Sequence, residues 1–232
     1  MQTNAASAPR STVSAAPAFD RDLDLDLDLD ALAALDVEAL PDRRAHRVAR
    51  GGAVEVLVNC AGIMDLRSLA ATDWSVATRL LRVDLESPLR PMALVIAAMK
   101  ASRRGTILNV SSMAGVTPLR GGAFYGAAKA GLLMASEIAR AELAQDGVRV
   151  VTVLPGPVRS GLEQRARAQV PDTLISRLLP TGDAGALAEK MVEACATGQA
   201  RVVYPSFYAI AERFPGLAGR FTAAFSPTPI DA

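Results

Sequence analysis

Short apolar runs rich in β-branched residues recur along the chain from about residue 54 onward. Three of them, at 54–58, 106–110 and 148–154, begin after glycine-containing turns or end at turn-forming residues. A continuous apolar run of this length between such residues is typical of a buried strand. A shorter run at 201–204 has the same texture. The pattern therefore predicts four short strands.

Between these runs lie longer stretches rich in Ala, Leu and Met, at 73–101, 122–145 and 184–197. This composition predicts helices. Strands that alternate with helices are joined as parallel neighbours by helical crossovers, which predicts an α/β fold with a doubly wound parallel sheet. Such sheets bind ligands at the carboxyl ends of their strands, so we expect functional residues directly after each strand.

The first part of the chain has a different texture. Small and polar residues dominate to residue 20, and Asp alternates with Leu over 22–30. We interpret 1–34 as a low-complexity, disordered lead, followed by a single α/β domain over 35–232. The alternation also fits a strand with an acidic face or a calcium site. Five unpaired carboxylates on one face would repel each other, however, and calcium loops need turn residues where leucines stand here.

Charge and cysteine content narrow the class of protein. The 25 Lys and Arg nearly balance the 24 Asp and Glu, with no long basic run, which argues against a nucleic-acid partner. The most apolar run, 89–99, is much shorter than the ~20 residues that span a bilayer, so we expect no transmembrane segment. Cys60, Cys195 and His46 have no metal-ligand spacing. We therefore predict no metal and a reduced, cytoplasmic setting.

Aromatic residues recur in the C-terminal segment, and their role is open from sequence alone. Packing against the sheet or over a substrate pocket is the expected role, and a partner or membrane surface is the alternative. The aromatic positions are Phe207, Tyr208, Phe214, Phe221 and Phe225.

Tyr125 and Lys129 form the first candidate for chemistry. Residues four apart share a face of a helix, so both side chains can point into one site. An unperturbed phenol has a pKa near 10, and a nearby ammonium lowers it. Tyr125 is therefore a candidate general acid/base, although such a pair alone also fits an ordinary helix surface.

Motifs at the predicted strand ends turn this pair into a recognisable pattern. Ser112 lies thirteen residues before Tyr125 in the sequence. The turns after the three main strands read Asn59-Cys60-Ala61-Gly62, Ser111-Ser112 and Pro155-Gly156-Pro157-Val158. With these motifs, residues 36–204 resemble the short-chain dehydrogenase/reductase family.

The resemblance implies a Rossmann-like fold and an oxidoreductase that interconverts a small-molecule carbonyl and alcohol with NAD or NADP. Tyr125 would exchange a proton with the substrate oxygen, and Ser112 would hydrogen-bond the same oxygen. Lys129 would lower the pKa of Tyr125 and bind the nicotinamide ribose. Homo-oligomerisation through the two long helices is also implied.

Further cofactor contacts follow from the same resemblance. The turn after the first strand would lie beside the cofactor, the turn after the third would hold the carboxamide, and Ser160 stands where the family often has Thr. An acidic residue in a strand at 35–37 would lie near the adenine. These positions are Asp36, Asn59, Ala61, Gly62, Pro155, Gly156, Val158 and Ser160.

Two departures from the family pattern affect the expected function. The family holds pyrophosphate on a Gly-rich turn after its first strand, and this sequence has no glycine before Gly51. We therefore expect the first two strand–helix units to be missing. Asp84 stands where the family carries an asparagine, as a further candidate catalytic residue that would accept from a water or pair with Lys129.

Two functions are compatible with these features. The first is a working NAD(P)-dependent oxidoreductase. The alternative is a truncated or decayed relative without catalysis, which serves as an interaction module or arises from a faulty gene start. Cofactor binding distinguishes them.

Overall fold

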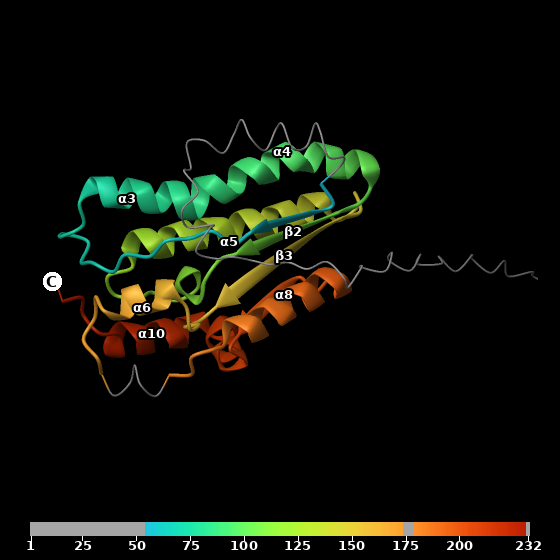
Figure 1. Ribbon diagram of the computed structural model, residues 1–232. Coiled ribbons are helices and arrows are strands. Elements are labelled where there is room, and N and C mark those ends of the chain that lie inside the picture. Colours follow the sequence, from blue (N-terminus) through green and yellow to red (C-terminus); the bar gives the residue numbers. More distant parts are fainter. Residues whose placement is uncertain (1–53, 174–178, 231–232) are drawn as a thin grey trace, which may run out of the picture.

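Four parallel strands form the centre of the molecule in the computed structural model, which describes residues 54–173 and 179–230 (Figure 1). The strands lie side by side in the order β1-β2-β3-β4. Their bounds are Val56–Asn59, Gly105–Val110, Val148–Pro155 and Arg201–Tyr204. The predicted α/β fold with a parallel sheet is confirmed. The predictions for the lead at 1–34, its Asp-Leu repeat, the strand at 35–37 and Asp36 lie outside the described residues.

The strand register explains how the sheet separates two apolar cores. Ile107 pairs with Val150, and the next residue along, Leu108, pairs with Val151. Successive side chains of a strand point to opposite faces. The first pair therefore packs into one core, with α4 (Ser87–Ser102) and α5 (Ala123–Leu143), and the second into the other, with α8 (Ala184–Thr197).

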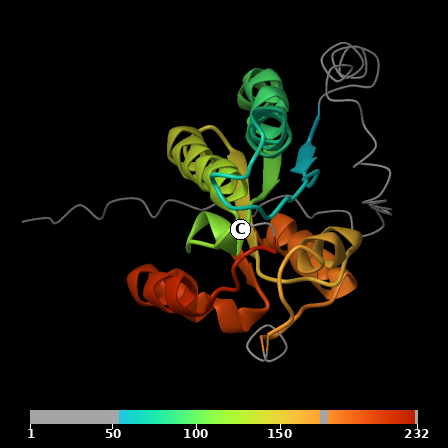
Figure 2. The ribbon, with the colours of Figure 1, turned by 90° about the vertical axis from the view of Figure 1, so that its left-hand side faces the viewer.

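Helices cover both faces of this sheet, as Figure 2 shows. The face with Ile107 is covered by α4 (Ser87–Ser102) and α5 (Ala123–Leu143), and the opposite face by α8 (Ala184–Thr197). Short elements α3 (Trp74–Leu81), η3 (Met113–Gly115) and α6 (Gly161–Arg167) connect these layers. None of the described helices has the length and hydropathy of a membrane span.

The helical stretch predicted over 73–101 is confirmed, but it is not a uniform α-helix. A π-helical segment, η2 (Arg82–Glu86), separates α3 from α4, and the Ser87 N–H donates to the carbonyl of Arg82, five residues back. Pro88 has no N–H to continue the α-helical pattern at this point. π-turns are frequent at functional sites, and this one carries Asp84 with its side chain inward.

The C-terminal segment forms three short elements after β4, namely η4 (Ser206–Tyr208), α9 (Ala209–Arg213) and α10 (Pro215–Phe225). Its aromatic rings are less buried than plain packing requires. Phe207, Phe214, Phe221 and Phe225 are each 51–53% exposed, and α10 has no buried residue. The four phenylalanine rings are thus only half covered, whereas the Tyr208 ring packs against Gly156 of the turn after β3.

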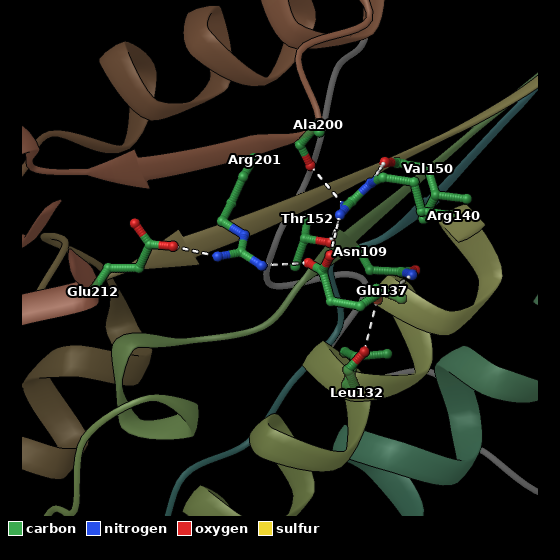
Figure 3. A network of polar contacts seen from close by, with 10 residues as sticks. Asn109, Leu132, Glu137, Arg140, Val150, Thr152, Ala200, Arg201 and Glu212 are labelled. Atoms are coloured by element: carbon green, nitrogen blue, oxygen red, sulfur yellow. Dashed lines mark hydrogen bonds and ion pairs between the residues drawn. The ribbon is translucent and has the colours of Figure 1, made fainter. Parts of the chain in front are cut away.

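A polar network fastens α5 to the last strands of the sheet (Figure 3). Glu137 accepts from Arg140 at 2.5 Å and from Arg201 of β4 at 2.6 Å. Arg201 also pairs with Glu212 of α9, and Arg140 donates to the carbonyl of Val150 at 2.8 Å. These contacts fix α5, the helix that carries Tyr125, relative to β3, β4 and α9.

Candidate active site

Four candidate residues from separate parts of the chain lie together beside the carboxyl ends of β1 and β2. Asp84 comes from η2, Ser112 follows β2, and Tyr125 and Lys129 lie in the first turns of α5. All four are buried, with exposed fractions of 0% for Asp84, 8% for Ser112, 5% for Tyr125 and 4% for Lys129. Ionisable groups in such an environment interact strongly because water screens them little.

Ser112 combines a local and a long-range role. Its hydroxyl oxygen accepts from the Ala114 N–H at 3.1 Å and so caps η3. The same side chain is hydrogen-bonded to Tyr125. A capping serine and a partner for the tyrosine were alternative readings of this residue, and the structure combines them.

The Lys129 ammonium is held on the side of Asp84. Its Nζ lies 3.0 Å from Asp84 Oδ1 and donates to the Val110 carbonyl at 3.2 Å. The same Nζ is 5.7 Å from the centre of the Tyr125 ring. An ammonium has three N–H donors, so two are directed to protein acceptors. Of the two roles expected for Asp84, the structure has the ion pair with Lys129.

The turn after β1 packs tightly against this ion pair. The Ile63 N–H lies 3.3 Å from each carboxylate oxygen of Asp84. A Cβ on Gly62 would lie 2.8 Å from Asp84 Oδ1 and 3.3 Å from Lys129 Nζ. A residue with a side chain at position 62 would therefore clash with the ion pair, and glycine allows the turn to approach it.

Burial dominates the protonation of Tyr125. It raises the pKa of the phenol, and the Lys129 ammonium and the Ser112 hydrogen bond only partly oppose it, while Asp84 raises it further. Lys129 therefore acts on the pKa of Tyr125 in the expected direction, but burial outweighs it and the pKa lies above its ordinary value. The physical reason is that desolvation of a phenolate costs more than one neutralised cation returns.

Each partner of this ion pair acts to keep the other charged. Burial acts to lower the pKa of Lys129, but the Asp84 carboxylate outweighs it and raises that pKa above its usual range. Burial raises the pKa of the Asp84 carboxyl, and Lys129 acts against that shift. The Cys60 thiol is a further ionisable neighbour, because its charge interacts with Lys129.

The Asn59 side chain is buried and hydrogen-bonded within the protein. It donates to Asn109 Oδ1 at 2.8 Å and to the Pro88 carbonyl at 3.2 Å, and Asn109 in turn donates to Ser136 of α5 at 2.9 Å. This buried chain of hydrogen bonds fixes the turn that contains Ala61 and Gly62. Asn59 thus supports the turn through its side chain.

The turn after β3 forms a second group of candidate residues. The Gly156 N–H donates to the Tyr204 carbonyl at 2.8 Å, and a Cβ on Gly156 would lie 2.7 Å from the Tyr208 ring. Val158 forms a bridge with Gly182. Pro155 is the last residue of β3, and the Ser160 hydroxyl accepts from the Glu163 N–H at 3.2 Å, capping α6. Strand pairing and the α6 cap therefore fix this turn.

Sequence reasoning missed three groups that shape the site. The Val110 carbonyl and the Ile63 N–H hold Lys129 and Asp84, and the Ser111 hydroxyl donates to the Lys129 carbonyl at 2.7 Å. Backbone groups carry no residue-type signal. For Ser111, its place at a strand end was the available signal. Within residues 54–173 and 179–230, no His, Cys, Asp and Glu side chains gather as metal ligands.

Curated relatives share part of this sequence. The chain is 36% identical over 115 residues to the short-chain dehydrogenase/reductase olcF of Penicillium canescens, covering 48% of this chain and 43% of that protein. It is 35% identical over 128 residues to the trans-4-hydroxycyclohexanecarboxylate dehydrogenase of Sinomonas cyclohexanicum, covering 53% and 49%. The chain thus spans about half the length of these relatives.

Solved structures and a family model agree with this likeness. A short-chain dehydrogenase from Sphingobium yanoikuyae in complex with NADPH matches with a TM-score of 0.66 and 26% identity, over 85% of this chain and 81% of that chain. A gluconate 5-dehydrogenase from Burkholderia cenocepacia in complex with NADP and tartrate has the same fold, with a TM-score of 0.67, 24% identity and coverage of 76% and 74%. The model of the short chain dehydrogenase family matches residues 28–171, more than half of the chain. The chain therefore belongs to the short-chain dehydrogenase family.

Proposed function

We propose that this protein is an NAD(P)-dependent oxidoreductase that interconverts a carbonyl and an alcohol, with Tyr125 as the acid/base. The observation that carries the proposal is the buried cluster of Ser112, Tyr125 and Lys129 beside the carboxyl ends of β1 and β2. Ligands of open α/β sheets bind at this edge. Family membership supports the reaction class.

The proton chemistry follows from the state of Tyr125. Because burial raises the pKa of its phenol, Tyr125 is protonated at neutral pH and can donate to a substrate oxygen. The hydrogen bond with Ser112 orients the phenol, and the serine hydroxyl can also donate to that oxygen. When bound, the nicotinamide cofactor supplies or accepts the hydride.

The residues around Lys129 fit the nicotinamide ribose. Two of the three ammonium donors go to Asp84 and Val110, which leaves one for a ribose hydroxyl. Gly62 has no side chain to fill the space beside that ammonium. The turn at 59–62, Lys129, the turn at 155–158 and Ser160 would hold this end of the cofactor. The resemblance, rather than a contact, suggests Asp36 for the adenine.

The experiment that tests this proposal follows oxidation of NADPH and NADH at 340 nm by the purified protein with a panel of small ketones and aldehydes. We expect turnover by the wild type and loss of at least about a hundredfold in Tyr125→Phe, the lower end of general-acid effects. Tyr204→Phe, which removes a phenol hydroxyl from β4, is the matched control and should keep its turnover. Equal rates in wild type and Tyr125→Phe would refute the role of Tyr125.

One observation favours the alternative of a family member without catalysis. The Asp84 carboxylate neutralises the ammonium on which ribose binding would depend. A protein of this kind would keep its fold and show no saturable binding of either cofactor. Cofactor binding therefore distinguishes the two functions directly.

Assembly and cellular setting are parts of the same proposal. Leu94 of α4 and Met134 and Ile138 of α5 are exposed by 61%, 61% and 51%, on the two helices through which the family resemblance implies association. We propose that these helices form a homo-oligomer interface. Cys60 and Cys195 are free thiols, which supports a reducing, cytoplasmic setting.

A further inference from the structure

The Asp84 carboxylate has no task in the proton transfer described above, yet the site is built around it. Its side chain is fully buried and binds Lys129 Nζ at 3.0 Å. Removing a carboxylate from water is costly unless a charged partner and hydrogen bonds replace the lost hydration. Lys129 is that partner, and the Ile63 N–H at 3.3 Å adds a hydrogen bond.

Two local features fix Asp84 in this position. The π-turn of η2 carries it inward between α3 and α4. Gly62 lets the turn after β1 approach, since a Cβ there would lie 2.8 Å from Asp84 Oδ1. The carboxylate is therefore held from two sides. If Lys129 moved away, Asp84 would remain as a buried charge without its cationic partner.

Counting charges shows what this arrangement does to Tyr125. With Asp84 ionised and Lys129 protonated, the cluster is neutral, so loss of the Tyr125 proton leaves a net negative charge inside the protein. With an uncharged residue at position 84, the same loss would take the cluster from positive to neutral. The second change is easier in a buried environment. Asp84 thus opposes ionisation of Tyr125.

The other groups that face the pair are few among the described residues. The Cys60 thiol, in the turn after β1, interacts electrostatically with Lys129, and burial raises its pKa, so it stays neutral through the physiological range. Ser112 contributes a hydrogen bond and no charge. The carboxylate at position 84 is therefore the negative charge beside Lys129 that a single substitution can remove.

We propose that Asp84 is a positioning residue that holds the Lys129 ammonium in a buried ion pair and, by neutralising that ammonium, opposes loss of the Tyr125 proton. This inference rests on the proposed function, in which Tyr125 exchanges the proton. It concerns the pH range over which Tyr125 can exchange that proton. Asp84 itself acts through Lys129 and touches no reacting atom.

The test is Asp84→Asn, because an amide has nearly the same shape and its oxygen can still accept from Ile63. Ionisation of Tyr125 is followed by tyrosinate absorbance, as the difference between each protein and its Tyr125→Phe counterpart, with no cofactor or substrate present. We expect the midpoint to fall by about one pH unit, the lower end of the effect of one nearby charge. The rate of alcohol oxidation should rise at correspondingly lower pH.

Asp146→Asn is the matched control, because it removes a carboxylate whose ion pair with Lys100, at 2.9 Å, lies at the surface. It should leave the midpoint unchanged, and the shift in Asp84→Asn should persist with Cys60→Ser. If Asp84→Asn does not fold, Asp84→Ser removes the same charge with a smaller side chain and must produce the same shift.

The outcomes separate this inference from the proposed function. A midpoint that stays or rises in Asp84→Asn overturns the role of Asp84, even if the wild type reduces carbonyls. If the wild type neither binds a cofactor nor turns over a substrate, the proposed function fails. The effect of Asp84 on Tyr125 ionisation is still measured in that case.

Discussion

Replacing Glu137 with Gln tests how firmly the helix that carries Tyr125 is fastened to the sheet. Glu137 accepts from Arg140 at 2.5 Å and from Arg201 at 2.6 Å, and its side chain is 33% exposed (Figure 3). Partly exposed ion pairs contribute roughly 0.2–1 kcal/mol each because solvent screens them. Two such contacts give an expected loss of about 0.4–2 kcal/mol in the free energy of unfolding at pH 7.

The pH dependence of this loss is the sharper test. Burial alone would raise the pKa of Glu137, but hydrogen bonds from Arg201 and Arg140 outweigh it and hold that pKa below its usual range. A carboxyl with a lowered pKa in the folded state stabilises fully above its unfolded pKa, about 4.3, and loses this effect as pH falls through the folded value. Urea unfolding of wild type and Glu137→Gln should therefore show a constant gap above about pH 5.5 that narrows below about pH 4.3.

Glu142→Gln, at an exposed position of the same helix, is the control and should change stability by less than about 0.5 kcal/mol at any pH. A gap between wild type and Glu137→Gln that is equal at pH 7 and pH 4 would refute the reasoning. So would the absence of any gap at pH 7.

Three further predictions concern the site and the assembly. Gly62→Ala should destabilise the protein by about 1–3 kcal/mol in urea unfolding, because its Cβ would lie 2.8 Å from an Asp84 oxygen; unchanged stability would show that the turn has room. Asn109→Ala should cost about 3 kcal/mol in the same assay, since it breaks buried hydrogen bonds of 2.8 and 2.9 Å, and a cost under about 1 kcal/mol would contradict this. Met134→Glu combined with Ile138→Glu should reduce the oligomer to a monomer in light scattering, and an unchanged mass would exclude this face as the interface.

The positions of the strands along the chain could be predicted from the sequence for a simple reason. A buried parallel strand reads as an uninterrupted apolar run, so 106–110 and 148–154 could be identified almost to the residue. The π-helical turn at η2 was not predicted, because composition indicates that a helix forms but not the register of its hydrogen bonds. Pro88 was visible in the sequence, and its missing N–H was the available signal.

The sequence could predict which residues lie together in the candidate site, but it could predict their protonation only in part. Spacing along a helix brought Tyr125 and Lys129 together correctly, and the strand-end pattern added Ser112. The direction of the Tyr125 pKa was not predictable, because it depends on how far burial outweighs one cation. That balance depends on tertiary packing, which places the Asp84 carboxylate in an ion pair with the Lys129 ammonium.

The measurement that tests the account most directly is a fluorescence titration of the purified protein with NADH and NADPH, with Lys129→Met and the surface variant Lys100→Met measured in parallel. The account predicts saturable binding of at least one cofactor, weakened about tenfold or more by Lys129→Met and unchanged by Lys100→Met, since loss of a charge-assisted hydrogen bond costs about 1.5–3 kcal/mol. Absence of saturable binding of both cofactors to the folded wild type, or equal binding by Lys129→Met, would contradict it.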